Sequence, residues 1–182
     1  MKNLTYLFFV IVLFTMNGCK KSSSSPSVVG KWTFSNITGT TTSESYSSSL
    51  QTTTYSYSNT MLTQSFSTGT PNLFSVTTEL WTFNNDGTYS INENFTNNGN
   101  TEVHSTNGSW GYLGNTKSNS ELVFTSDQSY LLPNGTYTIQ KVDNNQLTLA
   151  INNTSTTNYT YGGSTSVTIN TTNVVITFTR QQ

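Results

Sequence analysis

The sequence predicts an all-β protein built from short antiparallel strands. Ser, Thr and Asn make up 85 of the 182 residues, and Ala150 is the only alanine. Alanine is the best helix former, whereas Ser, Thr and Asn compete with the helix backbone for hydrogen bonds. The chain also holds 10 Tyr, 10 Phe and 3 Trp. These aromatic side chains fit half-buried strands, and they are too numerous for a disordered chain.

The first eighteen residues have the features of an export signal. Lys2 supplies a positive charge, and a mostly apolar run of 13 residues extends from Leu4 to Met16. A membrane-spanning helix needs about 20 apolar residues, whereas the apolar part of a signal peptide has about 7–15. We therefore expect residues 1–18 to be removed during export.

Cys19, the only cysteine, follows this run directly in the sequence Met16-Asn17-Gly18-Cys19. The segment resembles the lipobox of bacterial lipoproteins. The resemblance implies cleavage after Gly18 and acyl chains such as palmitate on Cys19, which then anchors the protein to a membrane. The alternatives are a disulfide, which needs a second cysteine, a catalytic thiol, which needs a nearby base, and a bystander thiol in a discarded signal.

A serine-rich tether, residues 19–27, separates Cys19 from the folded part. Such a segment is flexible. Many envelope lipoproteins carry acidic residues after the cysteine as a signal for surface export, and none occurs in this tether. We therefore expect the protein in the outer membrane, facing the periplasm. The 7 basic and 8 acidic residues leave no excess for a strongly basic face, so nucleic acid is excluded as a partner.

Residues 28–182 are expected to form one domain. In its first strand, Trp32 and Phe34 share one face because side chains alternate with a period of two. Residues 39–70 form a low-complexity Ser/Thr/Tyr segment that has high β propensity and few apolar residues. It predicts strands of irregular length, with an unstructured insertion as the alternative.

A hairpin is predicted around Asn85-Asp86-Gly87. A three-residue loop sets Phe83 opposite Tyr89 and so brings the apolar faces of both strands together, whereas a two-residue loop would separate these faces. The three-residue loop places Gly87 in the left-handed region, so we expect a positive φ there.

A second hairpin is predicted at Asn98-Gly99, where a two-residue loop sets Glu93 opposite His104. This pair is either an acid–base dyad or polar anchor for a ligand, or an ordinary structural pair. Further strands are predicted between regularly spaced turn signals, which is typical of a sandwich or a barrel. They cover 101–113, 121–125, 136–142, 147–153 and 167–180.

Several short motifs resemble the lipocalin-like domains of small bacterial lipoproteins. They are Gly30-Lys31-Trp32, "WTFNNDGTYSI" at 81–91, "GSWGY" at 108–112, "YTIQKVDNNQLTLAI" at 137–151 and "TFTR" at 177–180. The resemblance implies an up-and-down antiparallel barrel of about eight strands. It also implies that Arg180 lies over the indole of Trp32 and closes the base of the barrel.

No catalytic constellation is apparent, so we expect the protein not to be an enzyme, and we expect no metal and no cofactor. The first interpretation is a lipid-anchored barrel that binds a small apolar molecule. Its lining would comprise Tyr89, Ile91, Phe95, Trp110 and Tyr112. The alternative is a structural or interaction lipoprotein with a filled barrel. The sequence leaves the oligomeric state open.

Overall fold

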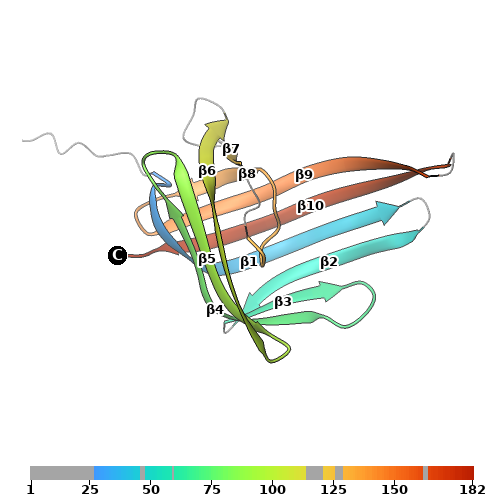
Figure 1. The fold of residues 1–182 in the computed structure, drawn as a ribbon, viewed down its shortest axis with the longest axis horizontal. Coiled ribbons are helices and arrows are strands. Elements are labelled where there is room, and N and C mark those ends of the chain that lie inside the picture. Colours follow the sequence, from blue (N-terminus) through green and yellow to red (C-terminus); the bar gives the residue numbers. More distant parts are fainter. Residues whose placement is uncertain (1–26, 46–47, 59, 114–120, 126–128, 162–163) are drawn as a thin grey trace, which may run out of the picture.

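The protein is a closed antiparallel β-barrel of ten strands (Figure 1). The computed structural model describes residues 27–45, 48–58, 60–113, 121–125, 129–161 and 164–182. The expected signal peptide, Cys19 and nearly all of the tether lie outside these residues. The strands are β1 (Gly30–Ser45), β2 (Ser48–Ser58), β3 (Met61–Phe66), β4 (Asn72–Phe83), β5 (Thr88–Asn97), β6 (Asn100–Leu113), β7 (Glu121–Phe124), β8 (Tyr137–Val142), β9 (Gln146–Tyr161) and β10 (Ser164–Arg180).

The expected count of eight strands is wrong, and β2 and β3 account for the difference. At one end of the barrel β1 pairs directly with β4, from Gly30↔Phe83 to Thr33↔Leu80. Further along, β1 pairs with β2 and β4 pairs with β3. The β2–β3 hairpin is therefore inserted between β1 and β4. It is formed by the low-complexity segment, whose Thr and Tyr residues suit strands although they offer little to bury.

The first predicted hairpin is confirmed. Phe83 lies opposite Tyr89, and Trp81 lies opposite Ile91. The backbone N–H of Gly87 donates to the Asn84 carbonyl at 3.2 Å, and Gly87 has a φ of +80°. Thr88 donates its N–H to the Asp86 carboxylate at 2.9 Å. This local hydrogen bond fixes the loop and thereby the register of β4 against β5.

The second predicted hairpin has the expected register as well. Asn97 lies opposite Asn100, and Glu93 lies opposite His104. The residues between the two strands, Asn98 and Gly99, both have positive φ, as two-residue hairpin loops require.

A β-bulge at Thr77 keeps the apolar side chains of β4 inside the barrel. The ladder to β5 shifts between Val76 and Thr78. Phe74 and Val76 are buried before the shift, and Glu79, Trp81 and Phe83 are buried after it. Without the extra residue, one of these two groups would face solvent.

Aromatic rings fill the centre of the barrel between the β1–β4 pairing and β7. Trp81 packs against Tyr137 at 5.8 Å and against Phe178 at 5.0 Å between ring centroids. Tyr89 packs edge to face on Phe124 at 5.0 Å. Such contacts contribute about 0.5–1.5 kcal/mol per pair beyond the burial of area. Among the described residues, no helix is both long enough and apolar enough to cross a membrane.

Candidate functional site

The candidate site is built on two carboxylates that face each other inside the barrel. Glu79 on β4 lies directly opposite Glu93 on β5. Both side chains are buried, with exposed fractions of 1% and 2%. Burial of a carboxylate is costly unless partners compensate its charge. The two glutamates solve this problem in different ways.

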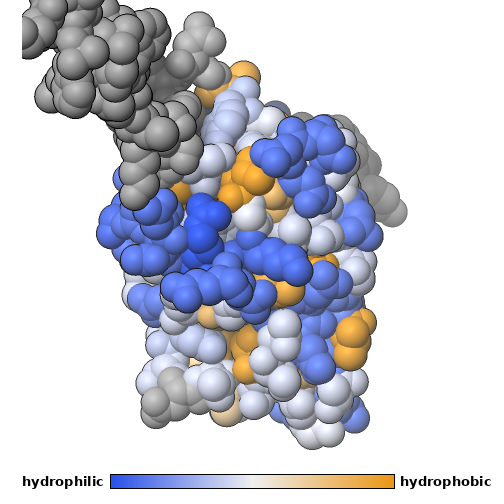
Figure 2. Space-filling view, turned by 90° about the vertical axis from the view of Figure 1, so that its left-hand side faces the viewer, coloured by the Kyte–Doolittle hydropathy of each residue, from blue (hydrophilic) through white to orange (hydrophobic). Residues whose placement is uncertain are grey.

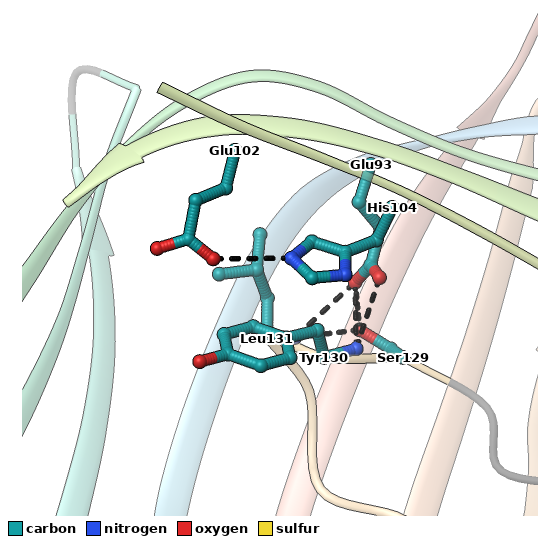
Figure 3. Close-up of polar contacts among 6 residues, drawn as sticks. All are labelled: Glu93, Glu102, His104, Ser129, Tyr130 and Leu131. Carbon is teal, nitrogen blue, oxygen red and sulfur yellow. Dashed lines mark hydrogen bonds and ion pairs between the residues drawn. The ribbon is translucent and has the colours of Figure 1, made fainter. Parts of the chain in front are cut away.

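Glu93 is held by the backbone of residues 129–132, which we call the capping loop (Figure 3). Its Oε1 accepts hydrogen bonds from Ser129 Oγ at 2.5 Å, from the Tyr130 N–H at 2.9 Å and from the Leu131 N–H at 3.2 Å. Its Oε2 accepts from the same Tyr130 N–H at 3.0 Å. These hydrogen bonds offset the cost of burying the carboxylate and fix the loop that supplies them.

Hydrogen bonds within the capping loop fix its conformation, and two of its side chains belong to the core. Ser129 Oγ accepts hydrogen bonds from the N–H groups of Leu131 at 3.1 Å and of Leu132 at 2.8 Å. The side chains of Leu131 and Leu132 are buried. On the far side, Gln64 of β3 donates to the Leu131 carbonyl at 3.3 Å. The capping loop therefore reaches from β5 to β3 and occupies the interior between them.

Three stacked rings cover the capping loop on the β6 side. Tyr130 stacks on His104, with centroids 4.5 Å apart and an interplanar angle of 8°. Phe95 stacks at 5.4 Å from Tyr130 and at 5.6 Å from His104. His104 Nε2 lies 3.1 Å from a carboxylate oxygen of Glu102 on the same strand. Glu93 and His104 are thus cross-strand neighbours, but the hydrogen bonds of Glu93 go to the loop and His104 Nε2 pairs with Glu102.

Glu79 has fewer donors than Glu93. Trp81 Nε1 donates to its Oε1 at 2.6 Å, while Oε2 is buried and accepts no hydrogen bond. Burial raises the pKa of Glu79 well above its usual range, and the charge of Glu93 raises it further. The raised pKa favours the protonated form of Glu79, while its Oε2 has no hydrogen-bond partner among the described residues.

The five residues expected to line a ligand site fall into two groups. Tyr89, Ile91 and Phe95 lie in the core with at most 2% exposure. Trp110 and Tyr112 pack edge to face on each other at 5.3 Å on β6, and Tyr112 is 46% exposed. The structure therefore does not bring all five to one enclosed surface.

Trp32 and Arg180 are in contact at the β1–β10 end of the barrel. They are cross-strand partners, and the guanidinium carbon lies 4.1 Å from the indole centroid. Arg180 also donates to the carbonyls of Val29 at 2.9 Å and Ser27 at 2.8 Å. Trp32 Nε1 donates to the Val28 carbonyl at 2.6 Å. A Cβ at Gly30 would lie 2.5 Å from the guanidinium, so glycine leaves room for this contact.

Sequence reasoning missed Glu79 and the capping loop as parts of one site. The register of the first hairpin already contained part of the answer, because pairing Phe83 with Tyr89 also pairs Glu79 with Glu93. The role of Ser129 and of the two N–H groups that follow it has no side-chain signature. Hydrogen-bond donors of a loop backbone are visible only in three dimensions.

The site can hold a proton on Glu79, and the hydrogen bonds of Glu93 can keep the capping loop closed. The described residues contain no group of three or more His, Cys, Asp or Glu side chains arranged to hold a metal ion. Comparisons with protein-family models, with curated proteins and with solved structures returned no match.

Proposed function

We propose that the protein is a lipid-anchored lipoprotein of the bacterial cell envelope whose lipocalin-like barrel is a filled scaffold that acts through its surface. The observation that carries the proposal is the state of the barrel interior. Tyr89, Ile91 and Phe95, the inward side chains of β5 that would line a ligand site, are already buried against protein neighbours.

The interior next to Glu93 is filled by the protein as well. The capping loop inserts Leu131 and Leu132 there, and Glu93 accepts hydrogen bonds from the Ser129 hydroxyl and from the N–H groups of Tyr130 and Leu131. An apolar ligand would have to displace these leucines and leave the loop N–H groups without their acceptor. Leaving a buried donor unpaired costs about 1–3 kcal/mol per group.

The surface that remains for contacts is polar and nearly free of charge. Strands β1, β2, β9 and β10 continue beyond the core as a Thr-, Ser- and Asn-rich sheet, in which Thr52, Thr42, Thr171 and Thr154 form one row across four strands. On the face drawn in Figure 2, hydrophobic residues form separate spots among hydrophilic ones. Contacts with an envelope partner would therefore rest on hydrogen bonds and shape rather than on charge.

The anchor supports the same proposal. The lipobox-like segment ends at Cys19, eight residues before Ser27, where the described chain begins. Acyl chains on Cys19 would hold the barrel close to the outer membrane on its periplasmic side, and more than one chain gives stable anchoring. The test is metabolic labelling with a radioactive fatty acid. The wild-type chain should be labelled, and Cys19→Ser should not be; equal labelling of both would contradict the anchor.

A second candidate function is binding of a small apolar molecule beneath the capping loop. The observation that favours it is the Oε2 atom of Glu79, which is buried and accepts no hydrogen bond from any described residue. Release of the capping loop would expose this atom together with the apolar side chains below it. This candidate requires the loop to open, whereas a filled scaffold requires it to stay closed.

Native mass spectrometry of the full chain extracted from membranes separates the two candidates. A filled scaffold gives the mass of the acylated chain alone. A small-molecule carrier gives an additional mass that is lost from Ile91→Trp, a variant that puts a larger side chain inside the barrel. An additional mass that depends on Ile91 would overturn the filled scaffold in favour of the carrier.

A further inference from the structure

Among the strands that the structure describes, none pairs with the outer edge of β9 beyond Ala150. β9 pairs with β10 from Gln146 to Tyr161, but with β8 only through Leu147–Ala150. From Asn152 to Asn158 every residue is exposed. In Figure 1, β9 and β10 run past the rest of the barrel, and no described strand lies along the outer side of β9 there.

This edge lacks the usual protection against pairing with another strand. Proteins block exposed edges with Lys, Pro, inward charges or β-bulges. Between Gln146 and Tyr161 the sequence contains neither proline nor a charged residue. The ladder between β9 and β10 shows no register shift along this length, so no bulge turns the edge away. The edge therefore offers backbone donors and acceptors to a regular partner strand.

The exposed stretch is nearly self-complementary in the antiparallel direction. With Ser155 at the centre, Asn152 would face Asn158 of a second copy, and Thr154 would face Thr156. Each residue of the stretch meets a small or polar side chain, and no charges of like sign come together. A two-fold axis requires this kind of self-matching surface.

We propose that two copies of the protein pair antiparallel through their β9 edges, with a two-fold axis at Ser155. The sheet then continues from β1, β10 and β9 of one copy into β9, β10 and β1 of the other. This surface lies apart from the low-complexity segment 39–70 and from the barrel interior. The strength of the dimer rests on the membrane anchor proposed above, and fatty-acid labelling tests that anchor separately from the cross-linking described below.

The expected strength of the contact fits a protein that is held at a membrane. Seven opposed residue pairs give three or four hydrogen-bonded pairs, about six to eight backbone hydrogen bonds in total. Without a hydrophobic centre, such an edge contact only partly offsets the cost of association in dilute solution. Confining both copies to one surface raises their effective concentration and favours the pair.

Disulfide cross-linking in the bacterial envelope tests the pairing in the full chain. Ser155→Cys places two thiols opposite each other on the axis, where directly opposed Cβ atoms are about 4.5–5.5 Å apart. Mild oxidation should convert most of this variant to a disulfide-linked dimer of twice the mass. The matched control is Asn170→Cys, which lies directly opposite Ser155 in the same row of the sheet but on β10, between β1 and β9. It should give the same small yield as the parent chain, which contains Cys19.

A third variant tests the direction of pairing. In the antiparallel arrangement, two copies of Thr154→Cys are offset diagonally, about 7–8 Å apart, so they should cross-link much less than Ser155→Cys. Equal yields from both positions would indicate parallel stacking and overturn the two-fold dimer. A Ser155→Cys yield no greater than that of Asn170→Cys would overturn it too, as would a cross-linked product of another mass.

Discussion

Arg180 lies over the indole of Trp32, with its guanidinium carbon 4.1 Å from the ring centroid. The two residues come from β10 and β1, which meet where the chain enters and leaves the barrel. The guanidinium also donates to two carbonyls of the segment before β1. One side chain therefore holds the beginning of the first strand to the end of the last.

This contact predicts a measurable coupling between the two residues. Arg180→Ala should lower the free energy of unfolding by about 2 kcal/mol, because it removes a cation–π contact and charged hydrogen bonds. Trp32→Ala should cost about 3–5 kcal/mol, since it also empties part of the core. In urea denaturation the double variant should lose about 1 kcal/mol less than the sum of the single losses. Additive losses, or an Arg180→Ala variant as stable as wild type, would contradict the coupling.

The hydrogen bonds of Glu93 predict that this residue controls the capping loop. Glu93→Ala leaves the N–H groups of Tyr130 and Leu131 without their acceptor, at about 1–3 kcal/mol per buried group. Amide hydrogen exchange at residues 129–132 should therefore become much faster. Glu102→Ala is the matched control, because Glu102 pairs only with the half-exposed His104. Unchanged exchange in Glu93→Ala would show that the loop is held by its leucines alone.

The raised pKa of Glu79 predicts that its contribution to the free energy of unfolding falls as the pH rises. Its pKa in the folded protein is raised above the ordinary value of 4.5, by burial first and then by the charge of Glu93. Between these two pKa values the native state holds more protons than the unfolded state. The stabilisation is thus complete below pH 4.5 and is lost as the pH rises through the folded pKa, at up to about 1.4 kcal/mol per pH unit.

Glu79→Gln tests this pH dependence because it keeps the shape and a hydrogen-bond donor without a titrating proton. Its stability in urea, relative to wild type, should increase as the pH rises above 4.5. Parallel pH profiles of the two proteins would show that Glu79 carries no raised pKa.

The left-handed conformation of Gly87 predicts a graded response to substitution. Its φ of +80° is accessible to glycine, tolerable for asparagine and strained for a β-branched residue. Gly87→Val should cost about 1–2 kcal/mol or more, and Gly87→Asn clearly less. The melting temperatures of both variants test this order of stability, which should be lower for Gly87→Val than for Gly87→Asn. Equal melting temperatures would mean that the loop adapts without strain.

Sequence reasoning succeeded where structure is decided locally. The two hairpin loops and the inward faces of β4 and β5 follow from turn chemistry and from the period of two, and the structure confirms both registers. Long-range pairing was not accessible in this way. Nothing in the pattern of residues 39–70 shows that β2 and β3 are inserted between β1 and β4.

The candidate site shows the same division. The pairing of Glu79 with Glu93 follows from a hairpin register, but their burial depends on the Thr77 bulge and on a loop from the other side of the barrel. The five expected ligand contacts were chosen as aromatic or apolar residues near one face. Whether such residues enclose a ligand or fill the core depends on what packs opposite them. Here Phe95 packs on Tyr130 of the capping loop, and Tyr89 packs on Phe124 of β7.

The contact between Arg180 and the segment before β1 has a mechanical consequence. If Cys19 is anchored in lipid, any pull between membrane and barrel enters through residues 27–29, which Arg180 ties to the last strand. β1 pairs on both sides, with β10 and with β4 or β2. A force along its axis therefore loads many ladder hydrogen bonds together in shear instead of opening them one after another, and the barrel should resist extension from this end better than from the β9–β10 tip.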